Sequence, residues 1–424
     1  MIALKKYADA GIAAALGLAS FVLLAFRYWL PNEKIFDEIY FARAAEEYLQ
    51  RRYIYENTHP PVTKLLITLS TMMFGGLPGG DNAYGWRFLD VVAGAVAVML
   101  AYALARRVTG SRIYGVYAAV LFGADGMHFV QSRIATPESF VVCFSLATLY
   151  ALLRYWDAIA AGIARAASAE DAPLRRVLET AVALVLGVLV VVVRFPHETP
   201  PTQVVIAIIA AAIAFAAYRL WRARPQGAGW LVAFGFCAAL LVTSKWYGVM
   251  TYGVAAVVGS YVALRAWRGG KASPIPLDAF VAVIIATFGI VYALAYIPHF
   301  IGLRDLQNLP PRPYTASDVV TMQVNAFLYH DHLRATHPYA SSWWQWPLDL
   351  RPILYYANYG NIGKIDTAAM IYSLPNPLLL WPGLFTVPLV GWFAWRERNR
   401  AYAVVVIAYL LQWLPWMFSP RIAF

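Results

Sequence analysis

Long apolar stretches separated by short basic segments dominate the chain. A membrane-spanning helix needs about 20 mostly apolar residues, and eleven stretches approach that length, although those near residues 113 and 230 are short. They lie near residues 10–30, 86–105, 113–129, 138–156, 178–195, 202–220, 230–244, 248–267, 277–297, 376–395 and 401–418. The first follows Lys5 and Lys6 and fits an uncleaved signal-anchor. The pattern predicts an all-α polytopic membrane protein, a transmembrane helical bundle of about 11 spans.

Two long polar stretches interrupt this pattern, at residues 31–85 and 298–375. A third, from His128 to Glu138, is short. Because most connections between elements run only a few residues, long loops of this kind usually carry function. Within the first loop, Asp37 and Glu38 open an amphipathic helix that is predicted to run to about Arg52. We expect residues 1–424 to form a single integral membrane catalytic domain.

Composition excludes a soluble protein. The chain is 61% hydrophobic and 13% charged, and its mean hydropathy is +0.56. Soluble domains have about a quarter of their residues charged. The two cysteines, Cys143 and Cys237, lie in apolar runs and indicate neither a disulfide framework nor a metal site.

The distribution of charge predicts the orientation. Short basic segments such as Arg106 to Arg112, Arg219 to Pro225, Arg265 to Lys271 and Arg396 to Arg400 all fall on one side if the N-terminus is cytoplasmic. The whole net charge of +11 then lies on the cytoplasmic side, and the outer side is balanced. This arrangement favours a membrane surface over nucleic acid as the partner, and it places both long loops outside the cell membrane.

The first outer loop contains candidate acid–base residues. Asp37 or Glu38 close to the low-dielectric boundary would have a raised pKa and could serve as a general base. The alternative is that these carboxylates only stabilise a helix N-terminus. After them, His59 precedes two prolines and Lys64. That segment is equally compatible with a turn followed by a snorkelling lysine.

Several cations are predicted at the same membrane level. One such residue could be structural, and Arg87 could simply pair with Asp90 on one helix face. Together with the nearby carboxylates, however, the set resembles an anion site, since ionisable residues at membrane depth usually face a cavity or a partner. The set consists of Lys64, Arg87, Arg133, Lys245 and Arg351.

The second long loop contains the sequence HPYASSWWQWPLDLRP. Its tryptophans fit an interfacial aromatic belt, but aromatic faces also bind sugars. His337, Tyr339, Trp343 and Trp344 are therefore candidate sugar or acceptor residues. The spacing of His330, His332 and His337 matches no standard zinc site, so no metal ligands are assigned.

Phosphate-binding motifs of nucleotide enzymes are missing from the sequence. It contains no GxGxxG, no P-loop and no pair of aspartates separated by one residue. A transferase built on this chain would need a donor other than a soluble nucleotide. A lipid phosphate fits, because its tail stays in the bilayer while its headgroup reaches the cations.

Taken together, seven segments resemble the protein O-mannosyltransferases, which use dolichyl- or polyprenyl-phosphate mannose and have the GT-C fold. In order, they are FDEIYF, HPPVTK, WRFLDVVAG, ADGMHFVQSRIATPESF, SKWYG, HPYASSWWQWPLDLRP and SLPNPLLLWPG. They span roughly residues 36–382. The chain lacks the family's eukaryotic MIR domain, which suggests a prokaryotic type. It departs from the family pattern at Thr63, Glu138 and Tyr247, and it ends at SPRIAF, where relatives continue.

The resemblance implies inverting transfer of mannose from a polyprenyl phosphate to Ser or Thr hydroxyls of exported proteins. Asp37 would be the catalytic base and Glu38 its neighbour. Lys64, Arg87, Arg133, Lys245 and Arg351 would bind the donor phosphate. The sugar or acceptor would contact His59, Glu138, His337, Tyr339, Trp343 and Trp344.

Partners and rivals follow from this interpretation. The expected partners are the polyprenyl-phosphate sugar, the membrane lipid and an acceptor protein or peptide delivered by the secretion translocon. No cofactor is required, and a divalent metal stays open. One rival is a GT-C transferase with a lipid A or glycan acceptor. The other is a transporter or flippase, which would place its charged residues near the bilayer midplane.

Overall fold

The computed structural model describes residues 2–77, 81–163, 173–223, 227–268, 277–301, 315–333, 337–362 and 365–419. The chain divides into two compact units. The first unit comprises Met1–Leu146 and Ala326–Phe424, and the second comprises Ala147–Asn325. Residues 269–271 of the predicted basic segment from Arg265 to Lys271, and the chain end from residue 420, lie outside the described residues.

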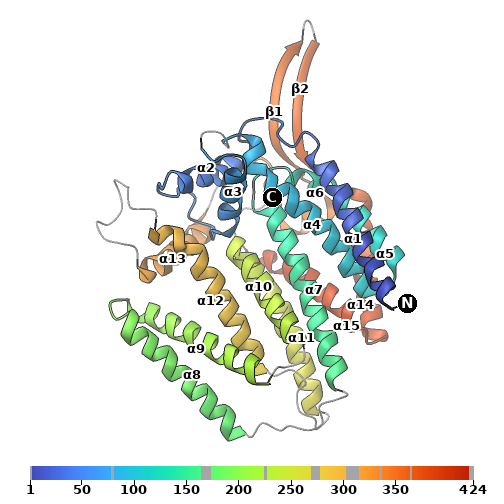
Figure 1. Cartoon of the computed structure of the whole chain (residues 1–424). Helices are drawn as coiled ribbons and strands as arrows, with labels where there is room; N and C mark the ends of the chain where they lie inside the picture. Colours follow the sequence, from blue (N-terminus) through green and yellow to red (C-terminus); the bar gives the residue numbers. More distant parts are fainter. Residues whose placement is uncertain are drawn as a thin grey trace. The chain divides into compact units, whose positions relative to one another are not determined.

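In the N-terminal part of the first unit, helix α4 packs against α1, α3 and α5 (Figure 1). The elements are α1 (Ile2–Ala25), α2 (Glu38–Leu49), α3 (Val62–Met73), α4 (Ala83–Thr109), α5 (Arg112–Gly123), α6 (Gly126–Gln131) and the start of α7 (Glu138–Ile163).

The C-terminal part of the first unit begins within α13 and ends with two packed helices, α14 and α15. Its elements are α13 (Ala316–His332), η2 (Trp343–Leu348), β1 (Ile353–Ile362), β2 (Ile365–Ser373), α14 (Pro377–Arg396), α15 (Arg400–Trp413) and η3 (Leu414–Phe418).

All regular elements of the second unit, within its described residues, are helices. Within it, α12 packs against both α9 and α10, and α8 packs against α9. The elements that follow α7 are α8 (Pro173–Arg194), α9 (Pro200–Ala223), α10 (Ala228–Ser244), η1 (Trp246–Gly248), α11 (Val249–Arg268) and α12 (Leu277–Ile301).

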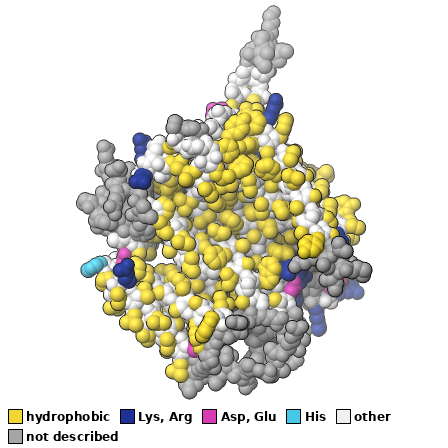
Figure 2. Space-filling model, viewed as in Figure 1, with side chains coloured by type: hydrophobic (Ala, Val, Ile, Leu, Met, Phe, Trp, Pro, Cys, Tyr) yellow, Lys and Arg dark blue, Asp and Glu magenta, His cyan; other side chains and the backbone are white. Residues whose placement is uncertain are grey.

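Seven of the described helices are long and apolar enough to cross a membrane. Their outward side chains are apolar, for example Phe385, which is 77% exposed on α14. Figure 2 shows hydrophobic side chains over most of the visible face. Water would not tolerate contiguous apolar surface on this scale, so the prediction of a polytopic helical bundle is confirmed.

The single span predicted near residues 113–129 is wrong. That stretch forms two helices, because Asp125 starts α6 with a side-chain cap in which Oδ1 accepts from the backbone N–H of His128 at 2.9 Å. Helix α5 has 12 residues, or about 18 Å at 1.5 Å per residue, which is too short for a hydrocarbon core of about 30 Å.

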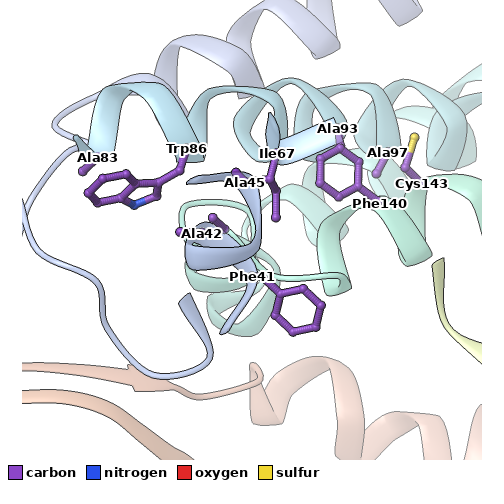
Figure 3. Packing of buried hydrophobic residues seen from close by; sticks show 11 residues of the cluster. Phe41, Ala42, Ala45, Ile67, Ala83, Trp86, Ala93, Ala97, Phe140 and Cys143 are labelled. Carbon is purple, nitrogen blue, oxygen red and sulfur yellow. The ribbon is translucent and has the colours of Figure 1, made fainter. Parts of the chain in front are cut away.

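Helix α2 confirms the predicted amphipathic helix of the first loop. Its buried face carries Phe41, Ala42 and Ala45. These side chains pack against Ile67 of α3 and Trp86 of α4, and the cluster continues to Phe140 and Cys143 on α7 (Figure 3). The loop around Asp37 is thereby fixed to the membrane helices rather than floating above them.

A two-stranded hairpin in the second loop was not predicted. Strand β1 pairs antiparallel with β2, from Ile353 opposite Ser373 to Ile362 opposite Ile365, with an irregularity at Leu354 and Tyr356. The hairpin projects beyond the ends of α1 and α6 (Figure 1). Ile353 and Tyr355 at its base are buried, whereas Tyr359 is 71% exposed. Only the base therefore takes part in the core.

Candidate active site

Asp37 lies at a distorted point of the chain. It is the N-cap residue of α2, yet its side chain makes no capping hydrogen bond, so it does not stabilise the helix in the usual way. The preceding residue, Phe36, has a left-handed φ of 48°, which costs about 1–2 kcal/mol for a residue with a side chain. The ring of Phe36 stacks on Tyr355 with centroids 4.2 Å apart. The hairpin base thus holds the strained backbone that presents Asp37.

Tyr355 connects two candidate carboxylates. Burial, followed by the negative charges of Glu138 and Asp37 among other contributions, raises the pKa of its phenol. Gln131 Nε2 donates to the phenol oxygen at 3.3 Å. The first long loop, the start of α7 and the hairpin base therefore meet around this ring.

Glu38 and Arg87 form a fully buried ion pair. Nε and Nη2 of Arg87 each donate to a carboxylate oxygen of Glu38 at 2.7 Å, and both side chains are 0% exposed. Glu38 also accepts from the backbone N–H groups of Ile35 and Ala135, at 3.0 and 2.8 Å. The alternative pairing of Arg87 with Asp90 is not found, since Asp90 accepts instead from Ser139 at 2.7 Å.

The remaining donors of Arg87 are also used within the protein. Nη1 donates to the carbonyls of Tyr28 and Pro31 at 3.1 and 2.9 Å, and Nη2 donates to that of Glu33 at 3.0 Å. All five N–H groups of a guanidinium are thereby engaged. In this conformation Arg87 organises residues 28–38 and has no N–H to offer a phosphate.

Lys64 is similarly engaged. Its ammonium, on a side chain that is 2% exposed, donates to the Glu56 carboxylate at 2.8 Å and to the carbonyls of Glu56 and His59 at 2.6 and 2.7 Å. These three bonds use the three donors of a lysine. The turn through residues 56–61 is folded around Lys64. The ammonium is held by protein oxygens and does not snorkel towards water.

Glu56 is the centre of this turn and was not predicted. Besides Lys64, it accepts from the backbone N–H of Thr58 and His59 at 3.1 Å and from His59 Nδ1 at 2.9 Å. Although burial opposes ionisation, Lys64 and His59 hold the pKa of Glu56 below its usual range. The signal in the sequence was an acidic residue eight positions before a lysine, with two prolines between them to reverse the chain.

His59 lies beside a second histidine. Its ring is 5.1 Å from that of His330, and His330 Nε2 lies 3.1 Å from the carbonyl oxygen of Thr58. This contact joins the first long loop to the end of α13. Within the described part of the chain, no three His, Cys, Asp or Glu side chains are grouped to hold a metal ion.

Arg133 differs from Lys64 and Arg87. Nη2 donates to the carbonyl of Phe26 at 2.7 Å, and the guanidinium lies over Phe129 at 4.5 Å. Burial and then the positive charge of Arg87 lower the pKa of Arg133. Unlike Arg87, it lies at a cavity.

Residues 337–351 of the second long loop form an ordered turn next to the loop that carries Asp37. Arg351 donates to the carbonyls of Pro338 and Ala340, at 3.3 and 3.2 Å, and so holds the HPYA turn. The N–H of Tyr339 donates to His337 Nδ1 at 3.2 Å. Tyr339 itself packs in a small cluster with Ile35 and Tyr355, which brings it to the same loop as Asp37.

The tryptophans of this loop face different surroundings. The carbonyl of Trp343 accepts from Trp413 Nε1 of α15 at 2.8 Å, and the two rings are 5.4 Å apart. Trp344 is 49% exposed. Trp343 therefore anchors the loop to the C-terminal helices, whereas Trp344 presents an open aromatic surface.

Lys245 belongs to the second unit. It follows α10 in extended backbone, and its ammonium lies 5.7 Å from the ring of Tyr247. Within the first unit, contacts of Glu38 with Arg87 and Ala135 and of Tyr355 with Phe36 join the predicted segments, and Tyr339 packs beside them. Lys245 lies in the other unit.

Comparisons with known proteins identify the family of the chain. Two models of one family match the chain, dolichyl-phosphate-mannose-protein mannosyltransferase at residues 14–195 and the C-terminal four-transmembrane region of protein O-mannosyltransferase at residues 315–424. Together they cover more than half of the chain.

Relatives match over most of their length. A polyprenol-phosphate-mannose–protein mannosyltransferase of Mycolicibacterium smegmatis is 28% identical over 417 residues, with 90% of this chain and 70% of that protein covered. One from Mycobacterium tuberculosis is 25% identical over 413 residues, with the same shares covered.

A solved structure shows the same fold. The Saccharomyces cerevisiae protein O-mannosyltransferase Pmt1-Pmt2 complex, bound to the sugar donor, aligns with a TM-score of 0.65 and 14% identity over 98% of this chain and 82% of that one. The predicted GT-C fold is confirmed.

Proposed function

The chain belongs to the protein O-mannosyltransferases, and from that premise we propose that it transfers mannose from a polyprenyl-phosphate carrier to Ser or Thr hydroxyls of proteins. The single observation that carries the assignment of the base is the position of Asp37. Its neighbour Glu38 is locked to Arg87, whereas Asp37 is half-buried and does not cap its helix.

The chemistry follows from this position. The acceptor oxygen attacks the anomeric carbon while the Asp37 carboxylate takes the hydroxyl proton, and the bond from that carbon to the phosphate oxygen breaks. The carrier leaves as polyprenyl phosphate. A positioned base is typically worth about 10²–10⁴-fold in rate, and a cation beside the leaving phosphate stabilises the charge that develops on it.

Supporting residues fall into two groups. Lys64, Glu56 and His59 shape the turn that returns to the membrane, and Arg87 with Glu38 fixes the loop segment before α2. We assign contact with the sugar or the acceptor to Tyr339, His337 and Trp344, and the exposure of Trp344 supports this assignment. Arg133 is the cation of the first unit that we assign to the phosphate.

We also propose that this site faces outward and that the N-terminus is cytoplasmic. Helix α4 has 27 residues, or about 40 Å. Arg87 lies near one end of it, and Arg106 near the other. At that second end Asp9 pairs with Arg106 and Arg112, at 3.4 and 2.6 Å. The basic end fits the cytoplasmic surface. Delivery of unfolded acceptors by the secretion translocon would bring them to the opposite face.

The test is transfer of radiolabelled mannose from polyprenyl-phosphate mannose to a Ser/Thr peptide, in membranes that contain the full chain. Asp37→Asn should abolish transfer with normal expression. Asp81→Asn is the matched control, because Asp81 is an exposed carboxylate of the same loop that pairs with Lys34. It should retain activity. Turnover by Asp37→Asn close to wild type would remove the base assignment, and label in lipid rather than in peptide would favour the rival acceptor class.

A further inference from the structure

A cavity of about 490 Å³ lies within the first unit, next to the loop that carries Asp37. Its walls come from residues 26–35, 129–134 and 370–372. Its volume falls in the range of small-ligand sites, about 300–1,000 Å³. The lining is apolar except for Arg27, Arg133 and the hydroxyl of Tyr372, and it contains no Asp or Glu. Two positive charges without a lining carboxylate favour an anion.

The guanidinium groups of Arg27 and Arg133 have N–H donors that make no hydrogen bond within the described residues. Within the described part of the chain, the one hydrogen bond of Arg133 is from Nη2 to the Phe26 carbonyl, and its buried Nε has no partner. Arg27 makes no hydrogen bond or ion pair from its side chain there, and its guanidinium lies 5.6 Å from the ring of Phe26. Arg27 is exposed, but the buried Nε of Arg133 calls for an explanation such as a bound ligand, because buried polar groups without partners are rare.

Arg87 and Lys64 show the contrast. Both lie in the same unit, and each spends every donor on protein oxygens. Unlike these two, Arg27 and Arg133 at the cavity have donors left for an external anion. Arg27 also has a left-handed φ of 56°, a strained conformation of the kind that persists mainly at functional sites.

The apolar part of the cavity continues onto a membrane surface. Phe26 and Leu30 line the cavity and are 68% and 51% exposed. They follow Leu18, Val22 and Leu23, which are all more than half exposed along α1. A ligand that matches both features has an anionic head for the arginines and a hydrocarbon tail for the helix face.

We propose that Arg27 and Arg133 bind the phosphate headgroup of a membrane lipid in this cavity. Guanidinium groups are suited to phosphate because they offer paired donors in a fixed plane. The cavity also touches the catalytic loop. Ile35 and Ile134 line it and pack in the cluster that contains Tyr355 and borders Phe36. Lipid bound here supports the backbone that holds Asp37. The lipid is either the polyprenyl phosphate of the proposed reaction or a glycerophospholipid.

Direct binding tests the proposal without relying on turnover. The full chain, purified in a neutral detergent, is titrated with a short-chain polyprenyl phosphate, with the matching polyprenol and with phosphatidylglycerol, and binding is measured by native mass spectrometry. The variants are Arg27→Gln, Arg133→Gln and the pair together. Arg51→Gln is the matched control, because Arg51 is exposed, has a left-handed φ of 54° and does not line the cavity.

The double variant should raise the Kd for the lipid phosphate by at least about tenfold, since two charge-assisted hydrogen-bonding groups are removed. Arg51→Gln should leave it unchanged. Polyprenol should bind far more weakly than its phosphate. A double variant within twofold of wild type, or polyprenol that binds as tightly as its phosphate, would overturn the proposal.

Two further comparisons complete the design. Phosphatidylglycerol that competes equally identifies a general lipid-phosphate site, whereas selectivity for the isoprenoid identifies the reaction's carrier. Thermal unfolding checks that each variant is folded, and Arg27→Gln alone, at an exposed position, serves if Arg133→Gln does not fold. Asp37→Asn should still bind the lipid phosphate, because Asp37 does not line the cavity. The binding result therefore stands even if the chain fails to transfer mannose.

Discussion

Arg87 and Glu38 are joined by two hydrogen bonds of 2.7 Å although 49 positions separate them in sequence. Neither side chain reaches solvent. The pair ties the start of α4 to the start of α2 and so fixes the position of the neighbouring Asp37. Glu38 and Arg87, two of the site candidates predicted from the sequence, are thus the pair that builds the loop.

Removing one partner of this pair should be strongly destabilising. Glu38→Gln leaves the guanidinium of Arg87 buried without a counter-charge, a change that costs about 3–5 kcal/mol. Thermal unfolding of the purified chain would show it as a lower midpoint, and Glu38→Gln combined with Arg87→Gln should recover part of the loss. Arg43→Gln is the control, since Arg43 pairs with Glu47 at 51% side-chain exposure and such pairs contribute about 0–1 kcal/mol. Equal midpoints for Glu38→Gln and Arg43→Gln would refute the structural role.

Glu56 should make stability depend on pH. Its pKa is below the usual value of 4.5 in the folded protein, so the unfolded chain binds the proton more readily. The stabilisation is therefore complete above about pH 4.5 and is lost as the pH falls below that value. Glu56→Gln removes this contribution, and its unfolding midpoint should vary less than that of wild type between pH 6 and pH 3. Parallel pH profiles for the two proteins would contradict the ion pair.

Hydropathy was sufficient to predict most of the membrane helices, because each predicted span needs only apolar length. It failed at residues 113–129, where a single capping aspartate, Asp125, divides one apolar run. The hairpin was missed for a different reason. The run from Ile353 to Ser373 is rich in strand-forming residues, but the surrounding aromatic segment favoured an interpretation as loop and short helix.

The candidate site, too, could be predicted only in part from the sequence. Residue types indicated which cations could bind an anion, but not which were already engaged. That depends on contacts such as Arg87 with Glu38 and Lys64 with Glu56, which join separate segments. Arg27 carries no signal in the sequence, since an arginine at the end of a predicted span is ordinary. Only its backbone conformation and the cavity distinguish it.

Orientation can be tested with single cysteines. In a chain with Cys143 and Cys237 replaced by alanine, Tyr359→Cys on the hairpin and Glu397→Cys between α14 and α15 both lie at exposed positions. A membrane-impermeant maleimide should label the former in intact cells and the latter only after permeabilisation, since the basic segment is predicted to be cytoplasmic. The reverse pattern would show that the orientation is inverted. Labelling of both cysteines from outside would exclude the predicted topology, in which the two positions lie on opposite sides of the membrane.

The contact between Phe36 and Tyr355 makes a last prediction about activity. The ring of Tyr355 stacks on a residue whose backbone is strained, at a centroid distance of 4.2 Å. If the ring holds the backbone in place, Tyr355→Phe should keep nearly full turnover because it keeps the stacking. Tyr355→Ala should lower kcat by about 10²-fold, because small misplacements of a catalytic group cost that much.

The two variants separate positioning from chemistry. A positional effect appears in kcat, leaves the apparent KM for the acceptor peptide nearly unchanged, and should be restored by Tyr355→Trp to a greater extent than by Tyr355→Leu, because only an aromatic ring can stack on Phe36. Loss of turnover in Tyr355→Phe equal to that in Tyr355→Ala would instead assign the effect to the phenol hydroxyl. Burial and then the negative charges of Glu138 and Asp37 raise the pKa of that hydroxyl, and in that case we would assign it to proton transfer and not to the support of the loop.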